Sequence, residues 1–183
     1  MVFLDSLVQD MNRNKTGLDE VNMRKVNPSR LGPNEIRGAI AEQLVRQWIQ
    51  KCPETDFFAD LPLKVNGYEA RHMPSGIVIF EGSITKLEYD FVVKYHNAIA
   101  LIEVKSLGLN GVEGKIEKAL SIGRELFPQT EVGFLLCFPA YCNRVVDVQR
   151  IEQAHPNARC LDLGYKKKNL TQAYSRFCEL QDS

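Results

Sequence analysis

Two apolar segments flanking His96-Asn97 constrain the fold of this chain more than any other stretch. Residues 88–95 and 98–105 are rich in β-branched and aromatic residues, which favours strands over helices. Asn tolerates a positive φ, so His96-Asn97 suits a two-residue hairpin turn. We therefore expect a β-hairpin over residues 88–105.

The turn sets which residues of the two strands face each other. With a two-residue turn, Asp90 is expected opposite Glu103, and Glu88 opposite Lys105. Side chains alternate between the faces of a strand, so these four residues should share one face. Opposed β-carbons lie about 5 Å apart, and like charges at that distance are destabilising. The two carboxylates therefore need a compensating partner.

Two interpretations of this charged face remain open. In the first, the repulsion between Asp90 and Glu103 is relieved because one carboxylate stays protonated or because a cation neutralises the pair. Mg²⁺ prefers oxygen ligands and is typically held by one or two carboxylates plus substrate phosphate. Lys105 would then add a positive charge beside a phosphate or an attacking water. In the alternative, the face is a solvated mixture of charges in which Lys105 neutralises Glu88.

Composition limits the class of protein. The chain has 183 residues, 44% of them hydrophobic, and a formal net charge of zero, so no overall basic field attracts nucleic acid, although local basic patches remain compatible. The five cysteines include no C-x-x-C pair, and a reducing, cytoplasmic location is expected. Since no apolar run reaches about 18 residues, no membrane span is expected either.

The chain divides into an N-terminal helix and loop extension over residues 1–32 and a single domain over residues 33–183. Apolar residues at helical spacing predict a helix near residues 1–11. The polar remainder of the extension is compatible with an arm, a lid or an oligomer contact. His72, beside a Pro-Ser-Gly turn between two predicted strands, is interpreted as structural or exposed.

Residues 34–51 form the clearest predicted helix, with Pro33 suited to its first position. Glu42 falls at the border of the apolar stripe, one turn after Gly38. It either points to water or looks over the edge of the core toward a site. In the second case, Gly38 would permit a close approach to the sheet.

The second half of the chain alternates between strands and helices. A helix over residues 112–127 and a buried strand over residues 131–138 follow the hairpin, which predicts a parallel, right-handed βαβ unit. Lys115 projects from the apolar side of that helix and must snorkel or find an anion. The remaining predicted elements are a helix at 144–154 capped by Asn143, a strand at 158–163, a basic loop at 165–168 and a helix at 170–180 capped by Asn169.

The order of these elements and their charged residues resembles the PD-(D/E)xK nuclease superfamily. Asp90 is followed, after twelve residues, by Glu103-Val104-Lys105, and Gly38 to Glu42 is similar to the family's first helical motif. The resemblance covers residues 33–140. One departure is that Tyr89, and not proline, precedes Asp90.

The resemblance implies a restriction-endonuclease-like fold, a three-layer α/β/α arrangement with a mixed central sheet (αβββαβ core) plus terminal helices. It also implies that Asp90 and Glu103 bind Mg²⁺, with Mn²⁺ as a substitute and the Val104 carbonyl as a further ligand. Glu42 would hold a second metal or its water. Lys105 would orient or deprotonate the attacking water.

The implied activity is metal-dependent endonucleolytic hydrolysis of DNA, with Lys115, Lys118 and Arg37 as nucleic-acid contacts. A homodimer is expected by analogy, because cutting two strands takes two sites. The alternative is a non-catalytic nucleic-acid-binding or protein-interaction module on the same fold. An unrelated phosphate-transfer enzyme is disfavoured, because residues 107–111 lack the length and the lysine of a P-loop.

Overall fold

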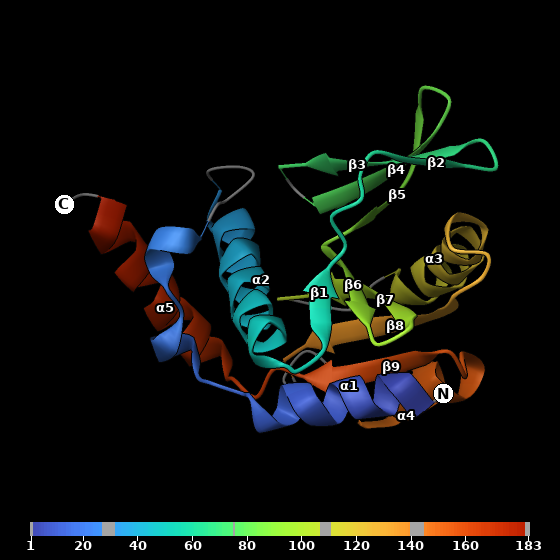
Figure 1. Ribbon diagram of the computed structural model, residues 1–183. Coiled ribbons are helices and arrows are strands. Elements are labelled where there is room, and N and C mark those ends of the chain that lie inside the picture. Colours follow the sequence, from blue (N-terminus) through green and yellow to red (C-terminus); the bar gives the residue numbers. More distant parts are fainter. Residues whose placement is uncertain (1, 27–31, 75, 107–110, 140–144, 182–183) are drawn as a thin grey trace.

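The computed structural model describes residues 2–26, 32–74, 76–106, 111–139 and 145–181 (Figure 1). Within these residues the chain forms two sheets and five α-helices. The protein is a mixed α/β structure. None of the helices in these ranges combines the length and the apolar character needed to cross a bilayer.

The central sheet is mixed. Its strands, in spatial order, are β1 (Thr55–Phe57), β6 (Phe91–Tyr95), β7 (Ala98–Val104), β8 (Glu131–Phe138) and β9 (Ala158–Asp162). The hairpin of β6 and β7 is antiparallel, whereas β7, β8 and β9 run parallel. The predicted βαβ unit is confirmed, with α3 (Val112–Leu126) as its crossover. Every residue of β8 after Glu131 is buried, as a strand between two covered faces requires.

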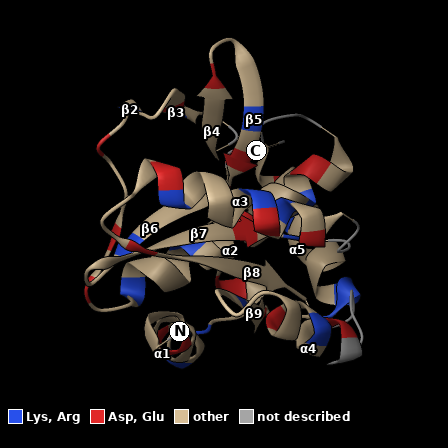
Figure 2. Ribbon diagram, turned by 90° about the vertical axis from the view of Figure 1, so that its right-hand side faces the viewer, with Lys and Arg blue, Asp and Glu red and all other residues tan. Residues whose placement is uncertain are grey.

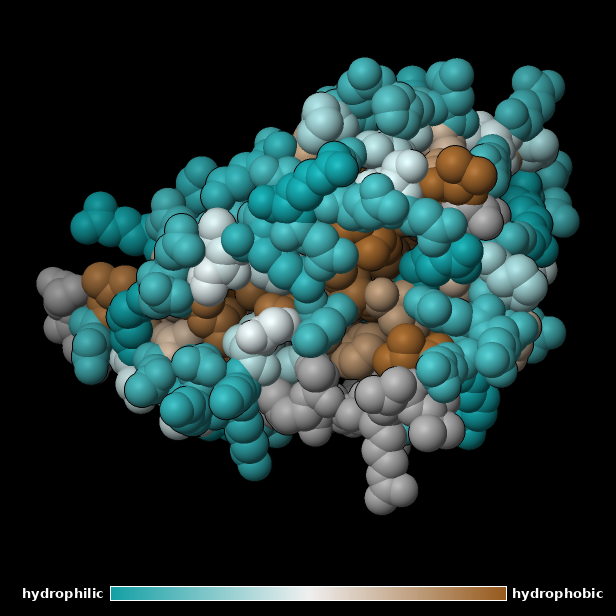
Figure 3. All heavy atoms as spheres, turned by 90° about the horizontal axis from the view of Figure 1, so that it is seen from below, coloured by the Kyte–Doolittle hydropathy of each residue, from teal (hydrophilic) through white to brown (hydrophobic). Residues whose placement is uncertain are grey.

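Helices cover both faces of the central sheet. One face packs on α1 (Val2–Arg13), α2 (Pro33–Lys51) and α5 (Lys167–Gln181). The other face packs on α3, on α4 (Val145–Ala154) and on part of the second sheet. Seen from below, polar side chains cover most of the surface, with smaller apolar patches between them (Figure 3).

The N-terminal segment is part of the core. Two short 3₁₀ helices, Leu18–Glu20 and Met23–Lys25, follow α1, and their apolar residues join the cluster beneath α2 and α5. Arg176 of α5 donates hydrogen bonds to the backbone carbonyls of Leu18, Asp19 and Val21. Residues 2–26 are therefore held by burial and by hydrogen bonds.

A second, antiparallel sheet stands above the central one (Figure 1). Its strands, in order, are β2 (Leu63–Val65), β3 (Tyr68–Met73), β4 (Gly76–Glu81) and β5 (Ile84–Tyr89). The hairpin of β3 and β4 agrees with the strand, turn and strand expected there. The union of four strands into a sheet of their own was not foreseen, because Glu88 and Tyr89 at the end of β5 were assigned to the central hairpin.

The prediction of one continuous strand over residues 88–95 is wrong in its first half. The chain bends at Asp90, so that β5 belongs to the second sheet and β6 to the central one. Glu88 pairs with Val78 of β4 and does not face Lys105. Tyr89 is fully buried at the bend, and its hydroxyl donates to the carbonyl of Ala119 at 3.1 Å. The buried anchor explains why the strand does not continue straight.

Smaller differences concern the C-terminal elements. The final helix begins at Lys167, so Asn169 lies inside it, and part of the predicted basic loop is helical. The prediction of Asn169 as the helix cap is therefore wrong; as the third residue of the helix, its Oδ1 accepts a hydrogen bond from the N–H of Lys166, which precedes the helix, at 3.0 Å. The predicted cap Asn143 lies outside the described residues.

Candidate active site

The hairpin of β6 and β7 brings Asp90 and Glu103 to one edge of the central sheet. Its predicted register is confirmed, since Tyr95 pairs with Ala98 and the pairing continues to Phe91 with Ile102. Asp90 is fixed at the start of β6 by two hydrogen bonds. Its N–H donates to the carbonyl of Ile102 at 3.1 Å, and the Val104 N–H donates to its Oδ2 at 2.6 Å.

Two lysines converge on Glu103, which is only 3% exposed. Lys105 Nζ lies 2.5 Å from Glu103 Oε1, and Lys115 Nζ bonds Oε2. Lys115 reaches the carboxylate from the first turn of α3, so the inward-facing lysine of the sequence finds an anion of the protein itself. A buried carboxylate with both oxygens engaged by cations keeps its charge at a tolerable cost.

Glu42 of α2 belongs to the same electrostatic group. Burial, followed by the charge of Glu103, raises the pKa of Glu42 to about 7. Burial, followed by the charges of Glu103 and Glu42, raises the pKa of Asp90 well above its ordinary value, although the hydrogen bond from Val104 acts in the opposite direction. Three carboxylates from a helix, a bend and a strand thus influence one another.

The charges of this group do not balance. Three ionised carboxylates against the ammonium groups of Lys105 and Lys115 would leave one negative charge, and this repulsion adds to burial in favouring protonation of Glu42 and Asp90. A bound cation would serve the same purpose as a proton. The site is therefore built to accept positive charge.

A divalent cation fits the chemistry of these donors, which are all carboxylate oxygens. In the structure, however, most of these oxygens already have partners: lysines contact both oxygens of Glu103, and the Val104 N–H donates to one oxygen of Asp90. Among the residues that the structure describes, no three His, Cys, Asp or Glu side chains are grouped as metal ligands. Binding a cation through Glu103 therefore requires at least one lysine to move away.

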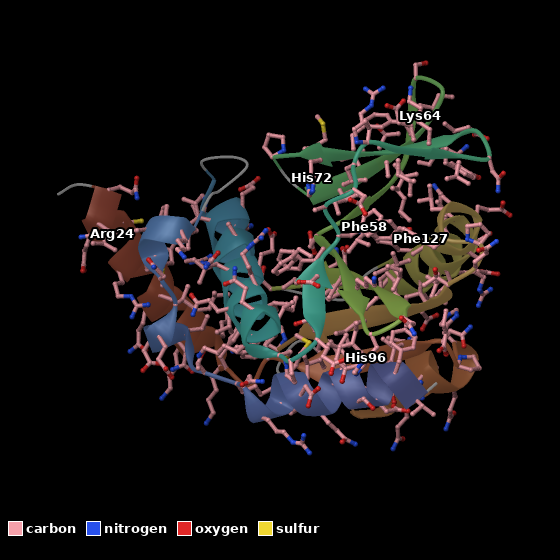
Figure 4. All side chains as sticks on the ribbon, viewed as in Figure 1. Arg24, Phe58, Lys64, His72, His96 and Phe127 are labelled. Carbon is pink, nitrogen blue, oxygen red and sulfur yellow. The ribbon has the colours of Figure 1, made fainter. Side chains whose placement is uncertain are left out.

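A cavity of about 390 Å³ opens beside the carboxylates, and Glu42 and Asp90 form part of its lining. Its other walls come from α2, β1 and the hairpin of β3 and β4. His72 and Phe58, which both line it, lie where the second sheet meets the central one (Figure 4). The cavity therefore leads from the surface to two of the predicted site residues.

The other predicted contacts are spread more widely. Lys118 is exposed on α3. The guanidinium of Arg37 lies 5.1 Å from the ring centroid of Tyr174, so this side chain rests on α5 and does not join the carboxylates. Val104 ends β7, and its N–H orients Asp90. A β-carbon on Gly38 would meet only Glu42 Oε1, at 3.9 Å, so the expected close approach of Gly38 to the sheet is wrong.

Of the residues that line the cavity, only Glu42 and Asp90 were predicted as site residues from the sequence; those that were missed include Arg46, Phe57, Phe58 and His72. Only Arg46 carries a usable signal, because it follows Glu42 by one helical turn and so lies on the same side of α2. The other three come from β1, the connection after it and β3. Their convergence depends on how the two sheets meet, which local sequence does not encode.

Comparisons with known proteins leave the assignment to the site itself. No family model matches the chain, and no curated protein matches it by sequence. A crystal structure of protein VC1899 from Vibrio cholerae is similar over 81% of this chain, with 20% identity and a TM-score of 0.39. The matched region amounts to 37% of that chain, so this protein spans well under half of its length.

Proposed function

We propose that this protein is a metal-dependent endonuclease of the PD-(D/E)xK type, with a restriction-endonuclease-like fold, that hydrolyses phosphodiester bonds in DNA. The observation that carries the proposal is the meeting of Asp90, Glu103 and Lys105 at the end of one hairpin, with Glu42 approaching from α2. The excess negative charge of this group supports a cation-dependent reaction.

Each residue has a role in the proposed reaction. Asp90, Glu103 and Glu42 would hold Mg²⁺, or Mn²⁺ in its place, with the Val104 carbonyl as a further ligand. A cation held there lowers the pKa of a bound water and neutralises charge that develops on the phosphate. Lys105, once released from Glu103, orients that water or stabilises the phosphate.

Lys115 is the second cation that such a release makes available. It starts from α3, so its ammonium group can turn from Glu103 toward a phosphate on the scissile strand. Acidic and basic residues are interspersed along the ribbon in Figure 2, including along α3. DNA contact by Lys115 and Lys118 would therefore be local, and a homodimer would supply the second site for a second strand.

One observation favours a second candidate, a non-catalytic nucleic-acid-binding or protein-interaction module. Both oxygens of Glu103 are engaged by lysines, and a site that stayed closed in this way would hold no metal. In that case Lys105 and Lys115 would serve to neutralise a buried acid. The two candidates make different predictions, because only the endonuclease should cut DNA when a divalent cation is added.

A nicking assay separates them. The protein is incubated with supercoiled plasmid in Mg²⁺, Mn²⁺ or EDTA, beside Asp90→Asn and Lys105→Met. We expect cation-dependent nicking in the wild type and a loss of at least about 100-fold in both variants, because general acid–base and charge-stabilising groups typically contribute that much. Lys86→Met is the matched control, since Lys86 pairs with Glu81 in the second sheet.

The control variant should nick at the wild-type rate. Nicking that persists in EDTA, or that survives in Asp90→Asn, would contradict the proposal. DNA binding without any cleavage in either cation would favour the second candidate.

A further inference from the structure

The cavity beside the carboxylates has a lining that differs from that of a simple water-filled cleft. Its volume of about 390 Å³ lies in the lower part of the range of small-molecule sites, roughly 300–1,000 Å³. Glu42 and Asp90 occupy one part of the lining, and the rest combines aromatic and cationic side chains with aliphatic residues and the amide of Gln43. Whatever enters the cavity therefore lies directly next to the proposed site of hydrolysis.

Arg46 and two phenylalanines form one wall of this cavity, with the guanidinium over both rings. The guanidinium of Arg46 lies 5.1 Å from the ring centroid of Phe57 and 4.8 Å from that of Phe91. The two rings also contact each other edge to face, at 5.7 Å between centroids. Phe91 is buried, Phe57 is half-buried and Arg46 is exposed, so the wall is anchored on the inside and accessible on the outside.

Polar groups line the same cavity. Gln43 is only 5% exposed, yet it lies in the lining, and its amide nitrogen donates a long hydrogen bond of 3.5 Å to Gln47. An amide has two N–H donors and a carbonyl acceptor, so that bond uses one of them. Lys25 and His72 are exposed members of the lining and add cationic or hydrogen-bonding groups.

We propose that this cavity binds an unpaired nucleobase of the substrate, so that the protein acts on single-stranded or locally unpaired nucleic acid. The inference rests on the proposed function, since it places the neighbouring phosphate at Glu42 and Asp90. Aromatic rings and guanidinium planes stack on the faces of unpaired bases, and amides hydrogen-bond their edges. Lys25 and Arg46 complement the charge of the adjoining backbone.

A continuous duplex does not fit this description. Within a duplex, each base is stacked on both faces and its Watson–Crick edge is paired, so a stacking wall and a buried amide have nothing to contact. Single strands, loops and bulges expose both the face and the edge of a base. The occupant is therefore defined by an exposed base and not by the width of a groove.

The second sheet contains a matched control for the stacking wall. The guanidinium of Arg71 lies 5.2 Å from the ring centroid of Phe80, in the same kind of arrangement as Arg46. Neither residue lines the cavity. Removing Arg71 thus deletes an arginine from an arginine–phenylalanine pair without touching the proposed base site.

The test measures binding in EDTA, where no hydrolysis interferes. Fluorescence anisotropy gives Kd at one fixed salt concentration for labelled single-stranded DNA, single-stranded RNA of the same sequence, and the DNA duplex. The variants are Arg46→Lys, Phe57→Leu and Arg71→Lys. Arg46→Lys keeps the charge and loses the planar group, and Phe57→Leu keeps an apolar side chain and loses the ring. Thermal unfolding confirms that each variant is folded.

We expect the wild type to bind the single strands more tightly than the duplex. Arg46→Lys and Phe57→Leu should each raise Kd for single strands by about 10-fold, as loss of one stacking partner does, and leave duplex binding unchanged. Arg71→Lys should change neither. Preference for the DNA or the RNA strand would identify the source of the base, and both results support an unpaired-base site.

Equal or tighter binding of the duplex would overturn the inference, as would equal weakening of all three ligands in Arg46→Lys. These outcomes are separate from those of the nicking assay. Single-strand binding that depends on the wall, without cleavage, would overturn the proposed hydrolysis and keep the base site. Cleavage of duplex DNA that is unaffected in Arg46→Lys would overturn the base site and keep the proposed hydrolysis.

Discussion

At the scale of single residues, Glu42 is a buried carboxyl group whose pKa depends on folding. Burial and the charge of Glu103 raise its pKa to about 7 in the folded protein. A carboxyl whose pKa is higher in the folded than in the unfolded state binds its proton more tightly when folded. The free energy of unfolding should therefore rise as pH falls from about 7 toward the ordinary pKa of 4.5.

Replacement of Glu42 by Gln should remove this dependence. The shift from 4.5 to about 7 corresponds to about 3 kcal/mol, so Glu42→Gln is expected to be more stable than the wild type by that amount at pH 8 and by less than about 1 kcal/mol at pH 5. Chemical denaturation in EDTA at both pH values measures the difference. The control is Glu35→Gln, at an exposed position of the same helix.

The raised pKa of Asp90 contributes a rise of the same sign, which Glu42→Gln should weaken but not abolish, because burial and Glu103 still raise that pKa. A Glu42→Gln protein no more stable than the wild type at pH 8 would mean that Glu42 is solvated and not part of the charged group. It would also remove one support for a cation site.

At the scale of elements, the start of β4 is pressed against the end of β5. Gly76 has a φ of +146°, and a β-carbon on it would lie 2.3 Å from the carbonyl oxygen of Tyr89. This close approach holds the second sheet at the bend that presents Asp90. Gly76 also lines the cavity, so the same contact shapes the proposed base site.

Gly76→Ala should therefore destabilise the protein by about 2 kcal/mol or more, because the new methyl group meets backbone and the φ is strained. Gly114→Ala in α3 is the control. Nothing lies within 4 Å of its β-carbon position, and alanine at a helical site should add about 0.5–1 kcal/mol of stability. Urea denaturation of the two variants should move the midpoint in opposite directions. Equal midpoints would contradict the close contact at Gly76.

The helix α2 is the element that links both proposals. It contributes Glu42 to the carboxylates, and Gln43 and Arg46 to the cavity. Its opposite side packs on α5 through Arg37 and Tyr174. A rigid helix held on two sides is well suited to keep an acid and a stacking group in fixed relation.

At the scale of the whole molecule, the N-terminal helix α1 packs tightly on one face of the central sheet. Leu4 is fully buried, and a β-carbon on Gly133 of β8 would lie 2.6 Å from Leu4 Cδ1. The small residue on β8 thus leaves room for the large one on α1. Arg159 of β9 fixes the same helix through Asp5, at 2.6 Å.

Leu4→Ala should cost about 2–4 kcal/mol of unfolding free energy, as other buried leucine truncations do. Val2→Ala, at a position that is 82% exposed, should change stability by less than about 0.5 kcal/mol. Guanidinium denaturation measures both. A Leu4→Ala protein as stable as the wild type would show that α1 is not part of the cooperative fold.

Local patterns in the sequence were enough for the register of β6 and β7, for α2 and for the crossover through α3. Each of these depends on alternation or helical periodicity over neighbouring residues, which short-range hydrogen bonding imposes. The register places Phe91 opposite Ile102, so Asp90 and Glu103 each adjoin the last paired residues of the hairpin. Glu88 was misplaced because it belongs to β5 of the second sheet, where it pairs with Val78, and not to the central sheet.

Only the tertiary structure decided the bend at Asp90, the second sheet and the cavity. The bend follows from the burial of Tyr89 against α3, which lies 30 residues away along the chain. The cavity gathers Arg46, Phe57 and His72 from three separate elements. Such meetings are set by how layers pack on one another, and packing between distant segments leaves no periodic trace in the sequence of any one of them.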